Sequence, residues 1–72
     1  MTEEDRKYFE YHFNVLSWNR AMGNQPKWSL DLWDDKMEAL RSKVSALGYK
    51  FEPKGMVTEY GIEYLKYELV KN

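Results

Sequence analysis

Apolar residues recur at spacings of four, three, four and three between Ser29 and Gly48, and they are Trp33, Met37, Leu40, Val44 and Leu47. Residues three and four positions apart share one face of an α-helix, so this spacing predicts an amphipathic helix. Ser29 or Asp31 can cap its start, and Gly48 supplies the left-handed residue that commonly ends a helix. The rest of the chain is expected to pack around this helix.

A second helix is predicted from Glu3 to Met22, with Thr2 as its capping residue. Its polar positions share one narrow arc: Arg6, Lys7, Glu10, Asn14 and Ser17. The large side chains form two adjacent stripes, one of Phe9, Phe13 and Leu16 and the other of Tyr8, Tyr11, Val15, Trp18 and Met22. Together they cover about 220° of the helix, compared with about 100° for an ordinary surface helix. We therefore expect two elements of the chain, or one element and a partner protein, to cover this helix.

Any part of this helix that stays exposed should belong to the second stripe, at Tyr8, Tyr11, Val15 and Trp18. Tyrosine and tryptophan have polar tips that tolerate water better than phenylalanine and leucine. An exposed stripe of this kind is typical of a protein interface.

Between the two helices, residues Gly23 to Lys27 are expected to form a turn, and Trp28 to pack against the second helix as a hydrophobic staple. After Gly48 the pattern changes. Tyr49–Glu52 alternates apolar and polar residues, Lys54–Gly55 is typical of a turn, and Met56–Val57 opens a second extended run. This pattern predicts a short β-hairpin.

The last segment fits two patterns. Thr58 can cap a final helix with one stripe of Ile62, Leu65 and Leu69 and another of Tyr60, Tyr64 and Tyr67. A strand from Gly61 to Val70 is the alternative, because Leu65, Tyr67 and Leu69 also alternate. We predict the helix.

The expected fold is a small single α+β domain over residues 1–72, with two N-terminal helices, a short hairpin and a C-terminal helix. Its predicted core consists of Phe9, Phe13, Leu16, Trp33, Met37, Leu40, Val44, Leu47, Phe51, Ile62, Leu65 and Leu69.

The nine residues Val57-Thr58-Glu59-Tyr60-Gly61-Ile62-Glu63-Tyr64-Leu65 resemble a segment of bacterial winged-helix regulators, in which the second strand of the wing enters the last helix. The shared pattern is a threonine cap, a glycine three residues later and a leucine four residues after that. The resemblance implies that the preceding hairpin is a wing. It also implies that the helix from Ser29 to Gly48 takes the place of the recognition helix.

That helix carries the wrong charge for DNA. A recognition helix presents its N-terminal residues to bases and phosphates, and here that end holds Asp31, Asp34, Asp35 and Glu38 beside Lys36. A winged-helix-like fold is therefore expected to serve protein binding. If the chain bound nucleic acid instead, the phosphate contacts would come from Arg41, Lys43, Lys50 and Lys54.

Composition narrows the class of protein. The 72 residues carry 11 basic and 12 acidic side chains, which is neither the basic excess of a nucleic-acid binder nor the acidic excess of a DNA mimic. The chain has no cysteine and no apolar run long enough for a membrane span. We expect a soluble, cytoplasmic protein.

The residues of common catalytic and metal sites are missing. The sequence contains one histidine, no glycine-rich phosphate loop and no nucleophile motif. His12 lies among aromatic residues and is interpreted as a core or interface residue. Asp31, Asp34 and Asp35 lack the alternation and central glycine of a calcium loop. We expect no enzymatic activity, no cofactor and no metal.

A binding module remains. The expected function is that of a small inhibitor or adaptor that docks on a larger protein, like many accessory proteins of phages and mobile elements. The alternatives are a winged-helix-like nucleic-acid-binding regulator and a self-assembling structural subunit. The predicted partner-binding residues are Tyr8, Tyr11, Val15, Trp18, Tyr60, Tyr64 and Tyr67.

Overall fold

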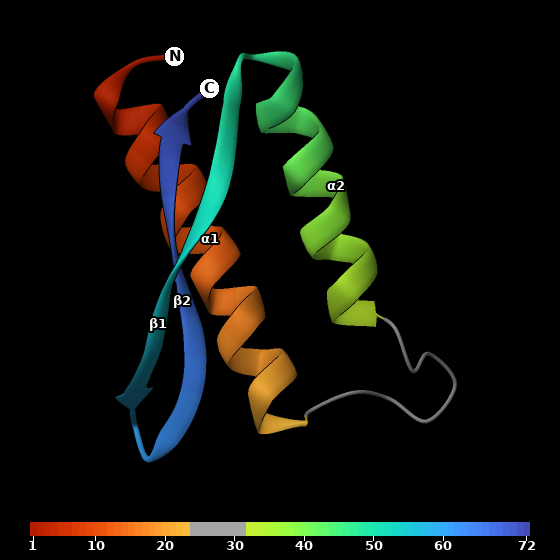
Figure 1. Ribbon diagram of the computed structural model, residues 1–72. Coiled ribbons are helices and arrows are strands. Elements are labelled where there is room, and N and C mark those ends of the chain that lie inside the picture. The colour runs from red at the N-terminus through yellow and green to blue at the C-terminus, as the bar shows by residue number, and fades with distance from the viewer. Residues whose placement is uncertain (24–31) are drawn as a thin grey trace.

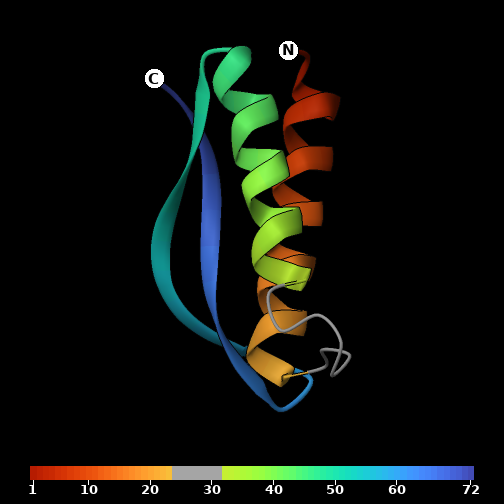
Figure 2. The ribbon, with the colours of Figure 1, turned by 90° about the vertical axis from the view of Figure 1, so that its right-hand side faces the viewer.

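The computed structural model describes residues 1–23 and 32–72. The elements follow in the order α1 (Glu3–Met22), α2 (Leu32–Ala46), β1 (Tyr49–Glu59) and β2 (Ile62–Lys71). The strands pair in an antiparallel two-stranded sheet, and both helices lie on the same side of it (Figure 2). α1 lies along β2, and α2 lies on the side of β1 (Figure 1). The predicted α+β class is confirmed.

α1 begins and ends where the sequence predicts. The Asp5 N–H donates to the Thr2 hydroxyl (3.1 Å), and the Thr2 N–H donates back to the Asp5 carboxylate (3.4 Å). This reciprocal pair is a capping box, which satisfies two amides that the helix itself cannot bond. At the other end Gly23 takes a left-handed conformation with φ 75°. A side chain is strained in that conformation, so glycine ends the helix at low cost.

α2 lies within the segment predicted as a helix. It runs from Leu32 to Ala46 and is followed by a turn in which the Gly48 N–H donates to the Ser45 carbonyl (3.0 Å). Gly48 has φ 85°, as expected of a residue that ends a helix. The capping roles predicted for Ser29 and Asp31 lie outside the described residues. The same holds for the Trp28 staple and for most of the turn predicted from residue 23 to 27.

The predicted C-terminal helix is wrong, and the strand alternative is the better description. Tyr60 and Gly61 both have positive φ, 51° and 76°, and join β1 to β2 as a two-residue turn. Two consecutive residues with positive φ are the mark of a type I′ turn, whose twist matches that of paired strands. Thr58 therefore lies in β1, opposite Glu63, and caps no helix.

The predicted turn at Lys54–Gly55 is also wrong. β1 continues through it, and the pairing with β2 shifts by one residue between Pro53 and Gly55. Such a bulge accommodates an extra residue without ending the strand. Proline has no N–H to donate. A strand tolerates Pro53 here because the residue lies next to the bulge, on a strand at the edge of the sheet.

The winged-helix likeness is not supported. The segment that resembled the end of a wing is a hairpin turn followed by β2, and no third helix follows among residues 32–72. The resemblance therefore no longer supports the assignment of the helix from Leu32 to Ala46 as a recognition helix.

The core lies between the two helices and the inner face of the sheet. Phe13 is fully buried, stacks on Phe51 with ring centroids 3.8 Å apart and meets the Tyr67 ring edge-on at 4.8 Å. Met37, Val44 and Leu69, all predicted core residues, are buried as well. All but one of the remaining predicted core residues are half-buried. The half-buried ones are Phe9, Leu16, Trp33, Leu40, Phe51, Ile62 and Leu65.

The exception is Leu47, whose side chain is 53% exposed. It follows the last residue of α2, so the chain has already left the helical path that would have turned this side chain inward. Its assignment to the core is wrong.

The polar arc of α1 faces the free edge of β2. Asn14 donates to the Tyr67 carbonyl (3.0 Å) and accepts from the Tyr67 N–H (2.8 Å). Ser17 donates to the Leu65 carbonyl (2.7 Å), and Glu10 accepts from the Leu69 N–H (3.0 Å). Three side chains, spaced so that they share a helix face, thus take the place of a neighbouring strand.

Candidate docking groove between α1 and the hairpin

The orientation of α1 leaves its second aromatic stripe in water. Because Phe13 turns into the core and Asn14 turns toward β2, the side of the helix that bears Tyr8, Tyr11 and Val15 faces away from both. These three side chains are exposed, Tyr11 to 64%. The sequence predicts this stripe, with Trp18, to be the part of α1 that stays uncovered; Trp18 itself is half-buried.

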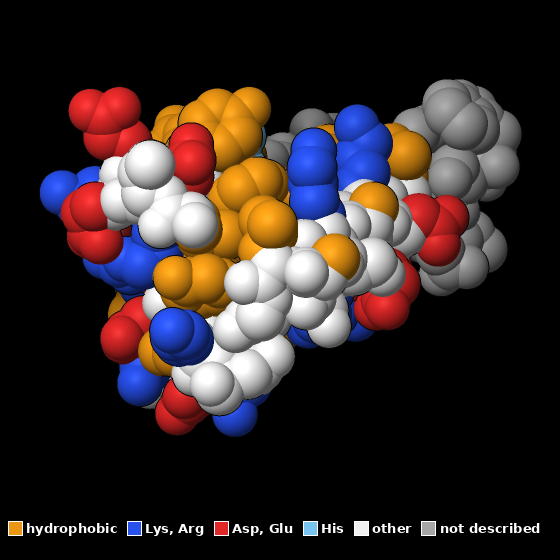
Figure 3. Space-filling model, turned by 90° about the horizontal axis from the view of Figure 1, so that it is seen from above, with side chains coloured by type: hydrophobic (Ala, Val, Ile, Leu, Met, Phe, Trp, Pro, Cys, Tyr) orange, Lys and Arg blue, Asp and Glu red, His pale blue; other side chains and the backbone are white. Residues whose placement is uncertain are grey.

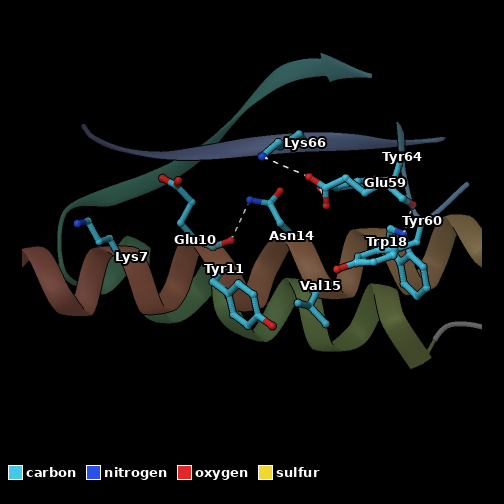
Figure 4. Close-up of a pocket in the computed structure, with 10 residues that line it drawn as sticks. All are labelled: Lys7, Glu10, Tyr11, Asn14, Val15, Trp18, Glu59, Tyr60, Tyr64 and Lys66. Atoms are coloured by element: carbon cyan, nitrogen blue, oxygen red, sulfur yellow. Dashed lines mark hydrogen bonds and ion pairs between the residues drawn. The ribbon is translucent and has the colours of Figure 1, made fainter. Parts of the chain in front are cut away.

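A groove of about 530 Å³ runs between this stripe and the hairpin (Figure 4). Its apolar lining comes from α1 and from the turn end of the hairpin: Tyr11, Val15, Trp18, Tyr60 and Tyr64. Its polar lining consists of Lys7, Glu10, Asn14, Glu59 and Lys66. The groove thus combines aromatic side chains from distant parts of the sequence with charges of both signs.

Two aromatic residues form one end of the groove. The Trp18 indole N–H donates to the Glu59 carbonyl (3.0 Å), which attaches α1 to the last residue of β1. Tyr60, 94% exposed at the hairpin turn, meets the Trp18 ring edge-on with centroids 6.5 Å apart. Figure 4 shows these two side chains next to each other, away from Lys7. The turn therefore presents an aromatic ring that is supported on one side only.

Tyr64 lines the groove from β2. Its side chain is only 2% exposed, and its hydroxyl donates to the Glu59 carboxylate (2.9 Å). Burial, together with this hydrogen bond to an anion, raises the pKa of the Tyr64 phenol to about 12. The phenol stays protonated at physiological pH and holds Glu59 in place.

The two carboxylates of the groove are already engaged. Glu10 receives hydrogen bonds from Arg6 (3.0 Å) and from the Leu69 N–H. Glu59 receives the Tyr64 hydroxyl and lies 3.7 Å from the Lys66 ammonium. Lys7, by contrast, forms no ion pair with any residue in the ranges 1–23 and 32–72.

No protein-family model, curated protein or solved structure matches this chain. Its function must therefore be argued from its own geometry.

Five of the seven predicted partner-binding residues line this groove, and Tyr8 and Tyr67 do not. Tyr8 lies on the same side of α1 but packs against His12, with ring centroids 4.2 Å apart. Tyr67 meets Phe13 on the core side of the sheet. The sequence analysis missed the polar residues of the groove, because the helix predicted after Thr58 gave no reason to place the hairpin turn beside α1. They are Lys7, Glu10, Asn14, Glu59 and Lys66.

Three of the four basic residues named for nucleic-acid binding contact rings or carboxylates of the chain, and the fourth, Lys50, is exposed. The Arg41 guanidinium lies 5.0 Å from the Phe13 ring centroid, and the Lys43 ammonium lies 5.9 Å from the Phe9 centroid. Both cations thus cover core rings. Lys54 lies within 3.7 Å of Glu52 and 3.4 Å of Glu68, so carboxylates neutralise its charge locally.

A second apolar area lies at the end of the molecule where α1 begins and α2 ends. Figure 3 looks onto this end and shows a band of hydrophobic side chains between charged ones. Met1, before α1, and Leu47, after α2, are exposed there. Neither of these two residues lines the groove beside α1.

Within residues 1–23 and 32–72, no group of three or more His, Asp or Glu side chains could hold a metal ion. In the same ranges, no helix is long and apolar enough to cross a membrane.

Proposed function

We propose that this chain is a non-enzymatic protein-interaction factor that docks on a larger protein through the groove between α1 and the hairpin. The observation that carries the proposal is the pair of exposed aromatic rings along this groove, Tyr11 and Tyr60, with the half-buried Trp18 beside Tyr60. Large rings that are held in place by their own chain lose little conformational entropy on binding. They are also the side chains that most often dominate binding energy at protein interfaces.

The exposure of the groove favours a protein over a small molecule. Pockets for small ligands bury most of the ligand surface, whereas Tyr11 and Tyr60 here stand mostly in water. A partner with an extended surface would bury both rings as well as the stripe beside them. Patches of exposed aromatic surface rimmed by charges are typical of protein interfaces.

The charge distribution favours a protein over nucleic acid. The chain has a net charge of −1, and three of the four basic residues suggested for phosphate contacts, Arg41, Lys43 and Lys54, cover core rings or pair with carboxylates. Nucleic-acid binding draws most of its affinity from clustered cations. A complex that weakens steeply between 50 and 200 mM salt would count against the proposal.

The test is capture of partners from a lysate of the native cells with three versions of the tagged chain. Tyr11→Ala removes a mostly exposed ring from the groove, so it should abolish capture while the far-UV circular dichroism and the unfolding midpoint stay unchanged. Leu47→Ala is the matched control, because it removes an exposed apolar side chain outside the groove. Trp18→Ala should behave like Tyr11→Ala if it remains folded.

Loss of capture with Leu47→Ala and not with Tyr11→Ala would refute the proposal and move the interface to the end of the molecule shown in Figure 3. A complex that contains only further copies of the chain would indicate self-assembly instead.

A further inference from the structure

Side chains of α1 occupy part of the β2 edge beside the groove. Strand addition requires free N–H and C=O groups along the edge of a sheet, and the groove lies beside β2. On that edge, Asn14 bonds both backbone groups of Tyr67, Ser17 bonds the Leu65 carbonyl and Glu10 bonds the Leu69 N–H. A strand added along Leu65–Leu69 would have to displace these side chains, whereas a partner that binds through its own side chains would not.

The floor of the groove has the length and regularity of a helix. Its residues on α1 run from Lys7 to Trp18, which lie eleven residues apart in sequence and about 16 Å apart along the helix axis at 1.5 Å per residue. Tyr11, Val15 and Trp18 recur at spacings of four and three and therefore form a row of knobs with gaps between them. A second helix with apolar residues at the same spacings fills such gaps.

The charges give the groove a direction. Lys7, at the end opposite Trp18 and Tyr60, forms no ion pair within the described ranges, whereas Glu10 and Glu59 are bonded by groups of their own chain. A carboxylate on a partner would therefore find a free cation only at the Lys7 end. At the opposite end the two rings offer apolar surface.

The geometry points to one class of partner: an amphipathic helix of another protein. This inference rests on the proposed function. This helix lays apolar residues with helical spacing over Tyr11, Val15 and Trp18 and places a carboxylate beside Lys7. Its aromatic or aliphatic end meets Tyr60. The experiment distinguishes this helix from three other occupants of the groove: a strand that adds to the sheet, nucleic acid and a second copy of this chain.

The experiment selects binders of the whole chain from a display library of random peptides of about 15 residues, long enough to form a helix. The selected peptides should share apolar residues at helical spacing and at least one Asp or Glu at one end. In a ¹⁵N-labelled sample, titration with the best peptide should shift the backbone signals of Tyr11 and Val15 and the indole signal of Trp18.

A charge-swap cycle tests the role of Lys7. Lys7→Glu should weaken the selected peptide about three- to tenfold, the range of an exposed ion pair turned into a repulsion. Exchanging the peptide carboxylate for lysine should restore binding to Lys7→Glu and weaken binding to the unchanged chain. Lys71→Glu is the control, because Lys71 is exposed and lies outside the groove.

Several results would overturn the inference. They are a selection without binders, selected peptides with strand-like alternation, binding that ignores Lys7→Glu, and signal shifts confined to residues outside the groove. Shifts of the groove signals by a single-stranded oligonucleotide, or dimers of the chain that Tyr11→Ala dissociates, would each replace the helix by another occupant. If partner capture is lost with Tyr11→Ala but not with Lys7→Glu, only the inference of a charged partner helix is refuted. If capture is unchanged with Tyr11→Ala, the proposed function itself is refuted.

Discussion

Asn14→Ala should destabilise the domain far more than an ordinary change on a helix surface. The variant removes two hydrogen bonds between α1 and β2 and leaves the N–H and the carbonyl of Tyr67 without their partner. A hydrogen bond contributes about 1 kcal/mol net, and an unsatisfied buried group costs about 1–3 kcal/mol. Because the site is half-buried and water can replace part of the loss, we expect a destabilisation of about 2–3 kcal/mol. That is a large share of the few kcal/mol available to so small a domain.

Asn19→Ala is a matched control. Asn19 also lies in α1, and its side chain donates to a carbonyl four residues earlier, that of Val15 (2.8 Å), but to no other element. Both variants gain the same helix propensity, so this contribution cancels in the comparison. We expect Asn19→Ala to change the free energy of unfolding by about 0.5 kcal/mol or less.

Urea unfolding followed by far-UV circular dichroism provides the measurement. With a denaturant slope of about 1 kcal/mol/M for a small protein, the midpoint of Asn14→Ala should fall by about 2–3 M relative to Asn19→Ala. A difference below about 0.5 kcal/mol would refute the reasoning. It would mean that water satisfies the edge of β2 as well as Asn14 does and that α1 is held by its apolar contacts alone.

Two further predictions concern the hairpin. Tyr60→Asn should raise the unfolding midpoint, because Tyr60 has φ 51° and asparagine adopts that conformation at a cost lower by about 0.5–1 kcal/mol. The same variant should weaken partner capture. Unchanged capture would show that the ring at the turn is not part of the interface. The raised pKa of Tyr64, about 12 compared with 10 for a free tyrosine, stabilises the fold below pH 10, and this contribution should be lost as the pH rises from 10 to 12. Urea midpoints measured across that window should fall for the unchanged chain and fall less for Tyr64→Phe; equal slopes would contradict the assignment.

The start and end of α1 could be predicted because local chemistry alone determines them. Thr2 and Asp5 form the capping box from positions three residues apart, and Gly23 ends the helix by its own conformational freedom. The same holds for the turn at Gly48. These signals need no information about the rest of the fold.

The role of the polar arc on α1 could not be predicted from the pattern. Hydrophobicity distinguishes apolar from polar positions, but it does not distinguish a polar side chain in water from one that bonds a strand edge. Glu10, Asn14 and Ser17 belong to the second kind. Their partners lie about 50 residues later in a segment whose strand and helix patterns overlap.

The hairpin was misjudged for two separate reasons. Its turn is carried by Tyr60 and Gly61, where asparagine or aspartate before glycine would have been the usual signal. Pro53 and Gly55 resemble the end of a strand, because neither residue is favourable within one, whereas here they mark a bulge. The groove beside α1 depends on where this turn lies, so its hairpin side could not be predicted either.

The bonds that close the edge of β2 also determine when the domain can fold during synthesis. They join residues 48, 53 and 59 positions apart in the chain, and β2 leaves the ribosome after every other element described here. Until then the polar arc of α1 has no strand edge to bind and stays open to solvent and to chaperones. We expect the nascent chain to remain protease-sensitive until β2 has emerged and then to become resistant in a single step, because contacts this distant in sequence form together rather than in stages.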